Sequence, residues 1–66
     1  MTELLGKTII VTGAGAGIGR GTARLLARHG ATVCCVDRDG KIARETALLI
    51  GEDGGRSLVA TVDITS

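Results

Sequence analysis

Three short runs of apolar and β-branched residues alternate along the chain with two segments whose apolar residues recur at helical spacing. The runs cover residues 7–12 (KTIIVT), 31–37 (ATVCCVD) and 57–62 (SLVATV). In the first run, apolar residues point to both faces of an extended strand, which is typical of a strand covered above and below. We therefore predict three strands of a parallel sheet.

The segments between these runs predict two helices, over residues 17–29 and 40–50. One side of the first helix is expected to hold Ile18, Thr22, Leu25, Leu26 and His29, with Arg20, Arg24 and Arg28 toward the other side. The apolar stripe of the second is expected to hold Ile42, Ala43, Thr46, Ala47, Leu49 and Ile50. Gly30 is the predicted C-terminal cap of the first helix, and Asp39 is the predicted N-cap of the second.

The resulting order, β-α-β-α-β, predicts an α/β fold. Short strands separated by helices favour parallel pairing through right-handed crossovers, with both helices on one face of the sheet. The three-stranded parallel sheet would have the order 3-2-1, and residues 51–55 (GEDGG) would form the turn-rich connector before its last strand. This arrangement is one half of a doubly wound, or Rossmann, fold.

Composition limits the size and the partners of this fold. The 66 residues can form one small domain, and without aromatic residues its core must be built from Ile, Val, Leu and Ala. A net charge of +1 gives no indication of a nucleic-acid or membrane surface. There is no secretory segment and no apolar run near membrane length, so we expect a cytoplasmic protein. The adjacent Cys34 and Cys35 are expected to be two small buried apolar residues. A disulfide between them would be strained, since neighbours on a strand point to opposite faces, and a redox or metal pair would need partners.

Five glycines lie within residues 11–21 (VTGAGAGIGRG), where the first predicted strand passes into the first predicted helix. A helix N-terminus carries unpaired N–H groups and a partial positive charge, so a pyrophosphate is a natural ligand where no side chain obstructs its approach. Gly13 would make the turn, Gly17 would open the helix toward the phosphates, and Gly19 would let the helix press on the strand.

The spacing of these glycines is informative. Neither G-x-G-x-x-G nor the Walker pattern fits them, whereas T-G-x-x-x-G-x-G fits from Thr12 to Gly19. A glycine-rich turn without a ligand is the plain alternative. Against it stands Asp37, which ends the second predicted strand eighteen positions after Gly19, close to where a carboxylate that accepts from a ribose hydroxyl is expected.

Residues 4–39 (LLGKTIIVTGAGAGIGRGTARLLARHGATVCCVDRD), together with VDIT at 62–65, resemble the start of a short-chain dehydrogenase/reductase. The resemblance covers essentially the whole chain. It implies that Gly13, Gly15, Ala16, Gly17, Ile18 and Gly19 form the pyrophosphate loop. It also implies that Asp37 holds the adenosine ribose and that Asp63 and Ile64 contact adenine. For Asp63, a plain carboxylate at a strand end is the alternative interpretation.

The charge of Asp37 predicts NAD rather than NADP as the cofactor. A 2′-phosphate beside this carboxylate would place two anions within a few ångström of each other. Members of the family that prefer NADP often carry a basic residue just before the middle glycine, and Ala16 stands there. Arg38 could in principle meet a phosphate, although an exposed loop arginine is the plainer interpretation.

The resemblance also identifies what these residues lack. Catalysis in that family uses a Tyr and a Lys four positions apart with a Ser and usually an Asn, and this chain has no Tyr and no Asn. We therefore expect no catalytic residue here, and interpret residues 1–66 as the amino-terminal part of a dinucleotide-binding domain of an oxidoreductase that moves a hydride between NAD and an alcohol or ketone. The 66 residues alone would be inactive. A stand-alone nucleotide-binding module and an assembly element remain alternatives.

An incomplete sheet would leave its first strand as an edge and one apolar face uncovered. Both features favour association. We therefore expect self-association, or contact with a missing carboxy-terminal part, and no nucleic-acid or membrane partner.

Overall fold

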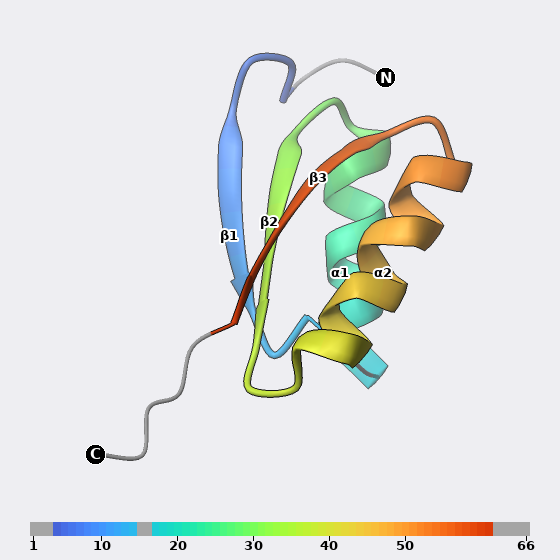
Figure 1. Ribbon diagram of the computed structural model, residues 1–66. Helices are drawn as coiled ribbons and strands as arrows, with labels where there is room; N and C mark the ends of the chain where they lie inside the picture. Colours follow the sequence, from blue (N-terminus) through green and yellow to red (C-terminus); the bar gives the residue numbers. More distant parts are fainter. Residues whose placement is uncertain (1–3, 15–16, 62–66) are drawn as a thin grey trace.

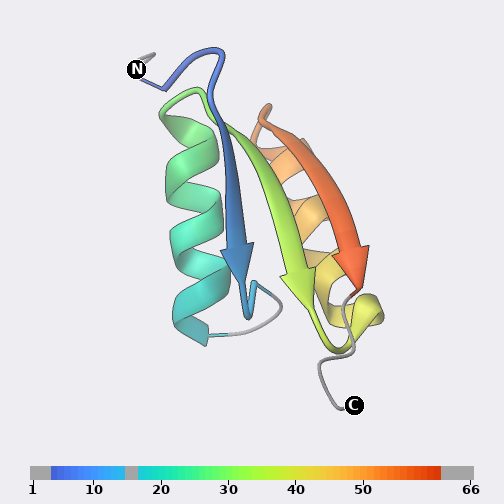
Figure 2. The same ribbon diagram turned by 90° about the vertical axis from the view of Figure 1, so that its left-hand side faces the viewer.

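A computed structural model describes residues 4–14 and 17–61 of the chain as one sheet with two helices (Figure 1). The elements are β1 (Thr8–Thr12), α1 (Gly17–Arg28), β2 (Thr32–Asp37), α2 (Gly40–Glu52) and β3 (Arg56–Thr61). The strands are parallel in the order β1-β2-β3, which confirms the predicted order 3-2-1. Both helices cover the same face of the sheet, as Figures 1 and 2 show from two sides.

Both predicted helix caps are confirmed by hydrogen bonds. Gly30 has a φ of 104°, and its N–H donates to the carbonyl of Ala27 while the N–H of Ala31 donates to that of Leu26, which closes α1 as a Schellman motif. At the start of α2, the Asp39 carboxylate accepts from the N–H groups of Lys41 and Ile42 at 3.0 and 3.4 Å. The local sequence therefore marks both ends correctly.

The connector between α2 and β3 is shorter than predicted. The helix continues through Gly51 and Glu52, and the N–H of Asp53 donates to the carbonyl of Leu49 at 3.0 Å. Gly54, with a φ of 84°, makes the turn that Gly51 was expected to begin. A glycine near a helix end does not stop the helix unless the chain takes the left-handed conformation there. The last predicted strand residue, Val62, lies outside the described residues.

Small residues build the core between the helices and the sheet. Its buried members are Ala14, Ala23, Ala27, Ala31, Val33, Cys35, Ala43 and Ile50. Thr46, which is polar, is fully buried among them. Because most of these side chains are single methyl groups, the helices lie close to the sheet, and packing depends on shape more than on large apolar surfaces.

The buried face of α1 differs in part from the predicted one. Leu26 packs against the core as expected, whereas the prediction was wrong for Ile18, Thr22 and Leu25. Ile18 is 89% exposed and Leu25 is 54% exposed, whereas Ala23 and Ala27 face the core. Arg20, expected to lie on the opposite side from the core, instead turns toward α2 and donates to the Thr46 hydroxyl. The helix packs through its smallest residues because they allow the closest approach, which a count of large apolar residues does not reveal.

The second predicted stripe is confirmed on α2. Ala43, Thr46 and Ile50 are buried, and Ile42, Ala47 and Leu49 are partly buried. Both cysteines are free thiols on β2. Cys35 is buried toward the helices as expected, whereas Cys34 is only partly buried, because neighbouring strand residues point to opposite faces and no helix covers the face of Cys34. Burial raises the pKa of the Cys35 thiol, with a smaller contribution from Cys34.

No helix within residues 4–14 and 17–61 is long and apolar enough to cross a membrane.

An ion pair joins the two helices at the end of the fold where α2 stops. The Arg24 guanidinium donates to both carboxylate oxygens of Asp53, at 3.0 and 3.2 Å. The hydrogen bonding by Arg24 lowers the pKa of Asp53 more than the charge of Arg24 does, whereas desolvation raises this pKa. The pair therefore contributes stability above the ordinary carboxyl pKa near 4 and loses it as pH falls through the lowered folded-state value.

Replacing Asp53 by asparagine is expected to remove this part of the acid destabilisation. The unfolding midpoint of the variant should fall less steeply than that of the parent protein below about pH 4, while at neutral pH the variant should be slightly less stable. Urea unfolding over a pH series measures both effects. Glu52→Gln, which makes the same charge change one residue earlier, is the control, and an identical pH profile for Asp53→Asn and the parent protein would contradict the assignment.

Candidate functional site

The glycine-rich turn lies at the carboxyl end of β1, where the chain passes into α1. Gly13 has a φ of 67° and Gly17 has a φ of 57°. Residues with a side chain rarely adopt these left-handed conformations, so glycine is required at both positions for the backbone to turn without strain. Gly15 and Ala16, which were predicted to belong to the same loop, lie outside the described residues.

Gly19 is required for a different reason. Its backbone is ordinary helix, but a Cβ added there would collide with the carbonyl oxygen of Gly13 and would lie 2.8 Å from its carbonyl carbon and 3.3 Å from the Cα of Ala14. The obstacle is backbone, which cannot rotate away as the end of a side chain can. The first turn of α1 therefore packs directly on the turn after β1. The close approach expected at Gly19 is confirmed, although it is made to this turn and not to the strand itself.

Ala14 fixes the turn to the rest of the fold. Its N–H donates to the carbonyl of Val36 at 3.1 Å, and its carbonyl accepts from the Thr46 hydroxyl at 2.7 Å. Ala14 is fully buried. The start of the loop is consequently held against the end of β2 and against α2 at once.

Asp37 ends β2 at the same edge of the sheet. Its Oδ1 accepts from the N–H of Asp39 at 3.0 Å, which orients the carboxylate at the start of the connection to α2. Because Val36, the residue before it, bonds to Ala14, Asp37 and the glycine turn are close neighbours. Parallel strands bring their carboxyl ends to one edge, and ligands of open α/β sheets bind there.

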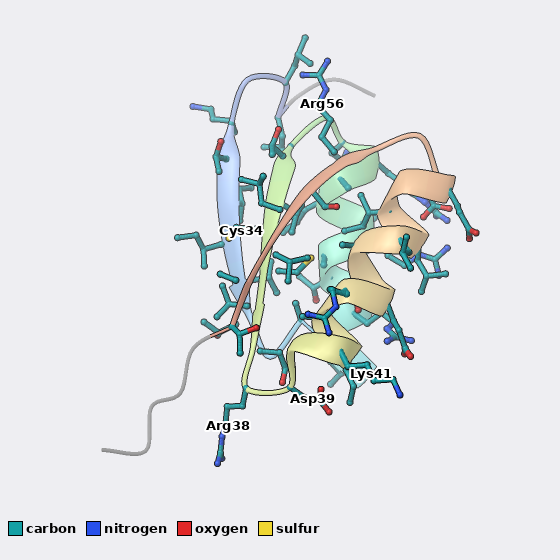
Figure 3. The ribbon with its side chains drawn as sticks, in the orientation of Figure 1. Cys34, Arg38, Asp39, Lys41 and Arg56 are labelled. Carbon is teal, nitrogen blue, oxygen red and sulfur yellow. The ribbon has the colours of Figure 1, made fainter. Side chains whose placement is uncertain are left out.

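Arg38 is exposed and extends away from the fold (Figure 3). Asp39 and Lys41 lie beside it at the start of α2, whereas Arg56 lies at the opposite end of the sheet. Ile18, in the first turn of α1, is also exposed. Neither Arg38 nor Ile18 takes part in the packing that shapes the turn.

The structure thus brings six of the predicted site residues to one edge of the sheet: Gly13, Gly17, Ile18, Gly19, Asp37 and Arg38. Asp63 and Ile64 lie outside the described residues, like Gly15 and Ala16. Sequence reasoning missed the roles of Ala14 and Thr46. The one available signal was a hydroxyl inside an apolar helical stripe, since a buried hydroxyl needs a hydrogen-bond partner.

Two other kinds of site are weaker candidates. Within the described part of the chain, no group of three or more His, Cys, Asp and Glu side chains could hold a metal ion. A shallow hollow of about 530 Å³ lies on the outer side of α2, between Arg44, Leu48 and Glu52, and includes none of the turn residues. It is open and mostly apolar, so the glycine turn with its converging backbone groups is the better candidate.

A family model described as short chain dehydrogenase matches residues 7–66. The ketoacyl reductase HetN of Nostoc sp. is 39% identical over 64 residues, which are 97% of this chain and 22% of that protein. The chain therefore spans about a fifth of the length of the curated relatives it matches.

Solved structures agree with this match. A 7α-hydroxysteroid dehydrogenase complexed with NADH and 7-oxo glycochenodeoxycholic acid superposes with a TM-score of 0.89 at 41% identity, covering 96% of this chain and 25% of that one. The landomycin C-6 ketoreductase LanV, with bound NADP and rabelomycin, superposes with a TM-score of 0.88 at 41% identity, covering 94% and 26%. The half-Rossmann arrangement, the glycine spacing and these similarities lead to one conclusion: this chain belongs to the short-chain dehydrogenase family.

Proposed function

We propose that this chain binds NAD through the turn after β1 and Asp37, as the dinucleotide-binding segment of an oxidoreductase. One observation carries the proposal. Gly13 and Gly17 take left-handed conformations. Because Gly19 has no side chain, the first turn of α1 packs directly on the carbonyl of Gly13, beside the strand that ends in Asp37. A diphosphate is the ligand that suits a helix N-terminus with no side chain in the way.

The residues divide into two groups by the part of the cofactor that each would bind. The pyrophosphate loop would comprise Gly13, Gly15, Ala16, Gly17, Ile18 and Gly19. Asp37 would accept from the hydroxyls of the adenosine ribose, and Asp63 and Ile64 would contact adenine. We assign the last two, and Gly15 and Ala16, from the resemblance of the sequence alone.

The preference for NAD over NADP rests on Asp37. One solved neighbour holds NADH and another holds NADP, so membership of the family does not choose between the cofactors. A 2′-phosphate next to the Asp37 carboxylate would be repelled, whereas a ribose hydroxyl can donate to it. Arg38, the nearest basic residue in sequence, is exposed at the same edge and extends outward from it.

The proposed activity is hydride transfer between NAD and an alcohol or ketone. A bound nicotinamide supplies the hydride donor or acceptor, while the residues of this chain hold the diphosphate and the ribose. The chain contains no Tyr and no Asn, so we propose that residues 1–66 form the amino-terminal part of the domain and do not carry the proton transfer.

Isothermal titration calorimetry with NAD and NADP tests the proposal directly. NAD should bind to the folded protein, and NADP should bind more weakly. Tighter binding of NADP would overturn the cofactor preference. Binding of neither nucleotide by a folded sample would overturn the proposed function and favour an assembly element.

We further propose that the uncovered face of the sheet packs against a second copy of this chain or against a carboxy-terminal part of the same protein. Ile10, Cys34 and Leu58 form a row across the three strands, and Ile10 and Leu58 are 67% and 56% exposed. An apolar row on an open sheet favours burial against a partner. Sedimentation of the 66 residues at micromolar concentration should give species larger than a monomer, and a well-folded monomer would contradict self-association. A cytoplasmic location remains a prediction from the sequence.

A further inference from the structure

A chain of hydrogen bonds runs from α1 through α2 into the glycine turn. Arg20 Nε donates to Thr46 Oγ1 at 2.9 Å, and Thr46 Oγ1 donates to the carbonyl oxygen of Ala14 at 2.7 Å. Thr46 and Ala14 are both fully buried, and Arg20 also reaches Glu45 at 3.4 Å. Both acceptors are therefore shielded from competing water.

The direction of each hydrogen bond follows from the chemistry of the groups. A guanidinium nitrogen can only donate, so the Thr46 oxygen accepts from Arg20. A carbonyl oxygen can only accept, so the Thr46 proton must point at Ala14. The Thr46 hydroxyl is thereby used as acceptor and donor at once, and its proton has one favourable direction.

The effect of this chain on the turn is specific. The N–H of Ala14 is already bonded to Val36, the residue before Asp37. The Thr46 hydroxyl donates to the other backbone polar group of Ala14, its carbonyl oxygen. Thr46 belongs to α2, which starts directly after Asp39. The start of the glycine turn is therefore tied to both segments that flank Asp37. Figure 2 shows the first turns of both helices at the edge where the strands end.

We propose that Thr46, oriented by Arg20, is a positioning residue that fixes the diphosphate-binding turn relative to Asp37. This inference rests on the proposed function, because it concerns the distance between the two parts of the same cofactor site. Thr46 itself touches no cofactor atom in this proposal. It acts through the carbonyl of Ala14, which holds the part of the turn against which the first turn of α1 packs at Gly19.

The test compares Thr46→Val, which keeps the shape of the side chain but removes the hydroxyl, with Thr46→Ser, which keeps the hydroxyl. Ser57→Ala is the matched control, since Ser57 Oγ donates to the Ala47 carbonyl of the same helix at 3.3 Å without contacting the turn. Calorimetry measures the affinity for NAD and, by competition, for adenosine. Thermal unfolding measures stability in parallel.

Thr46→Val is expected to weaken NAD binding about tenfold, since a buried hydrogen bond contributes roughly that factor to an equilibrium constant. Adenosine affinity should change by less than about twofold, because adenosine carries no diphosphate. Thr46→Ser should restore most of the NAD affinity, and Ser57→Ala should leave it unchanged. A merely structural role would lower stability without changing the ratio of the two affinities.

Three outcomes would overturn the inference while leaving the proposed function intact. They are unchanged NAD affinity in Thr46→Val, equal weakening of NAD and adenosine, and failure of Thr46→Ser to restore binding. If Thr46→Val does not fold, Arg20→Met is the deciding variant. It leaves the Thr46 oxygen without the Arg20 donor and should weaken NAD binding about threefold, and an unchanged affinity would overturn the role of these hydrogen bonds. Absence of NAD binding by the folded parent protein would instead refute the proposed function.

Discussion

Replacing Gly19 by alanine is expected to abolish measurable NAD binding and to destabilise the fold by about 3 kcal/mol. The added methyl group would collide with the carbonyl oxygen of Gly13 and lie 2.8 Å from its carbonyl carbon. Relief requires α1 to move away from the turn, since neither atom belongs to a flexible side chain. That movement would take the N–H groups at the start of α1 away from the place where the diphosphate binds.

Gly21→Ala is the matched control for this experiment. Gly21 lies two residues further along the same helix, and a Cβ built there meets nothing within 4 Å. Alanine is the better helix former by about 1 kcal/mol, so this variant should be slightly more stable and should bind NAD as the parent protein does. Urea unfolding and calorimetry measure both quantities. If Gly19→Ala were as stable as Gly21→Ala and bound NAD equally well, the close approach of α1 to the turn would not be essential.

Replacing Asp37 by alanine is expected to reduce the preference for NAD over NADP by a factor between about fivefold and several hundredfold. The carboxylate and a 2′-phosphate a few ångström apart repel each other by about 1 to 4 kcal/mol, depending on the effective dielectric constant. Removing the carboxylate lowers the affinity for NAD, because a ribose hydroxyl loses its acceptor, and raises the affinity for NADP. The two changes act in the same direction on the ratio.

Two further variants separate charge from structure. Asp37→Asn keeps an oxygen that can accept from the N–H of Asp39, as Asp37 Oδ1 does at 3.0 Å, but removes the charge. It should therefore shift the cofactor ratio with less loss of stability than Asp37→Ala. Asp53→Ala makes the same change in net charge at the far end of α2 and should leave the ratio unchanged. An unchanged ratio in both Asp37 variants would contradict the assignment of Asp37 as the residue that selects the cofactor.

Local patterns in the sequence determined the elements and the edge at which the site lies. Alternation between β-branched runs and helical spacing predicted three parallel strands and two helices, and Asp39 and Gly30 marked helix ends correctly because caps act on neighbouring residues. The spacing from Gly13 to Gly19 and the position of Asp37 followed from the same local order. Each of these signals depends on residues near one another in the chain.

The tertiary structure alone decided which face of α1 is buried and what holds the turn. Ala23 and Ala27 face the core while Ile18 faces outward, and Thr46 on α2 bonds to Ala14, which is thirty-two positions away in sequence. Whether a position requires glycine, and whether a buried hydroxyl finds a hydrogen-bond acceptor, depends on which backbone atom lies opposite it. For the Thr46 hydroxyl that atom belongs to a distant segment, so the pattern of residues around Thr46 indicates that a partner is needed but does not identify it. For Gly19 the atom lies in the preceding turn, which is why the local glycine spacing could predict the close approach.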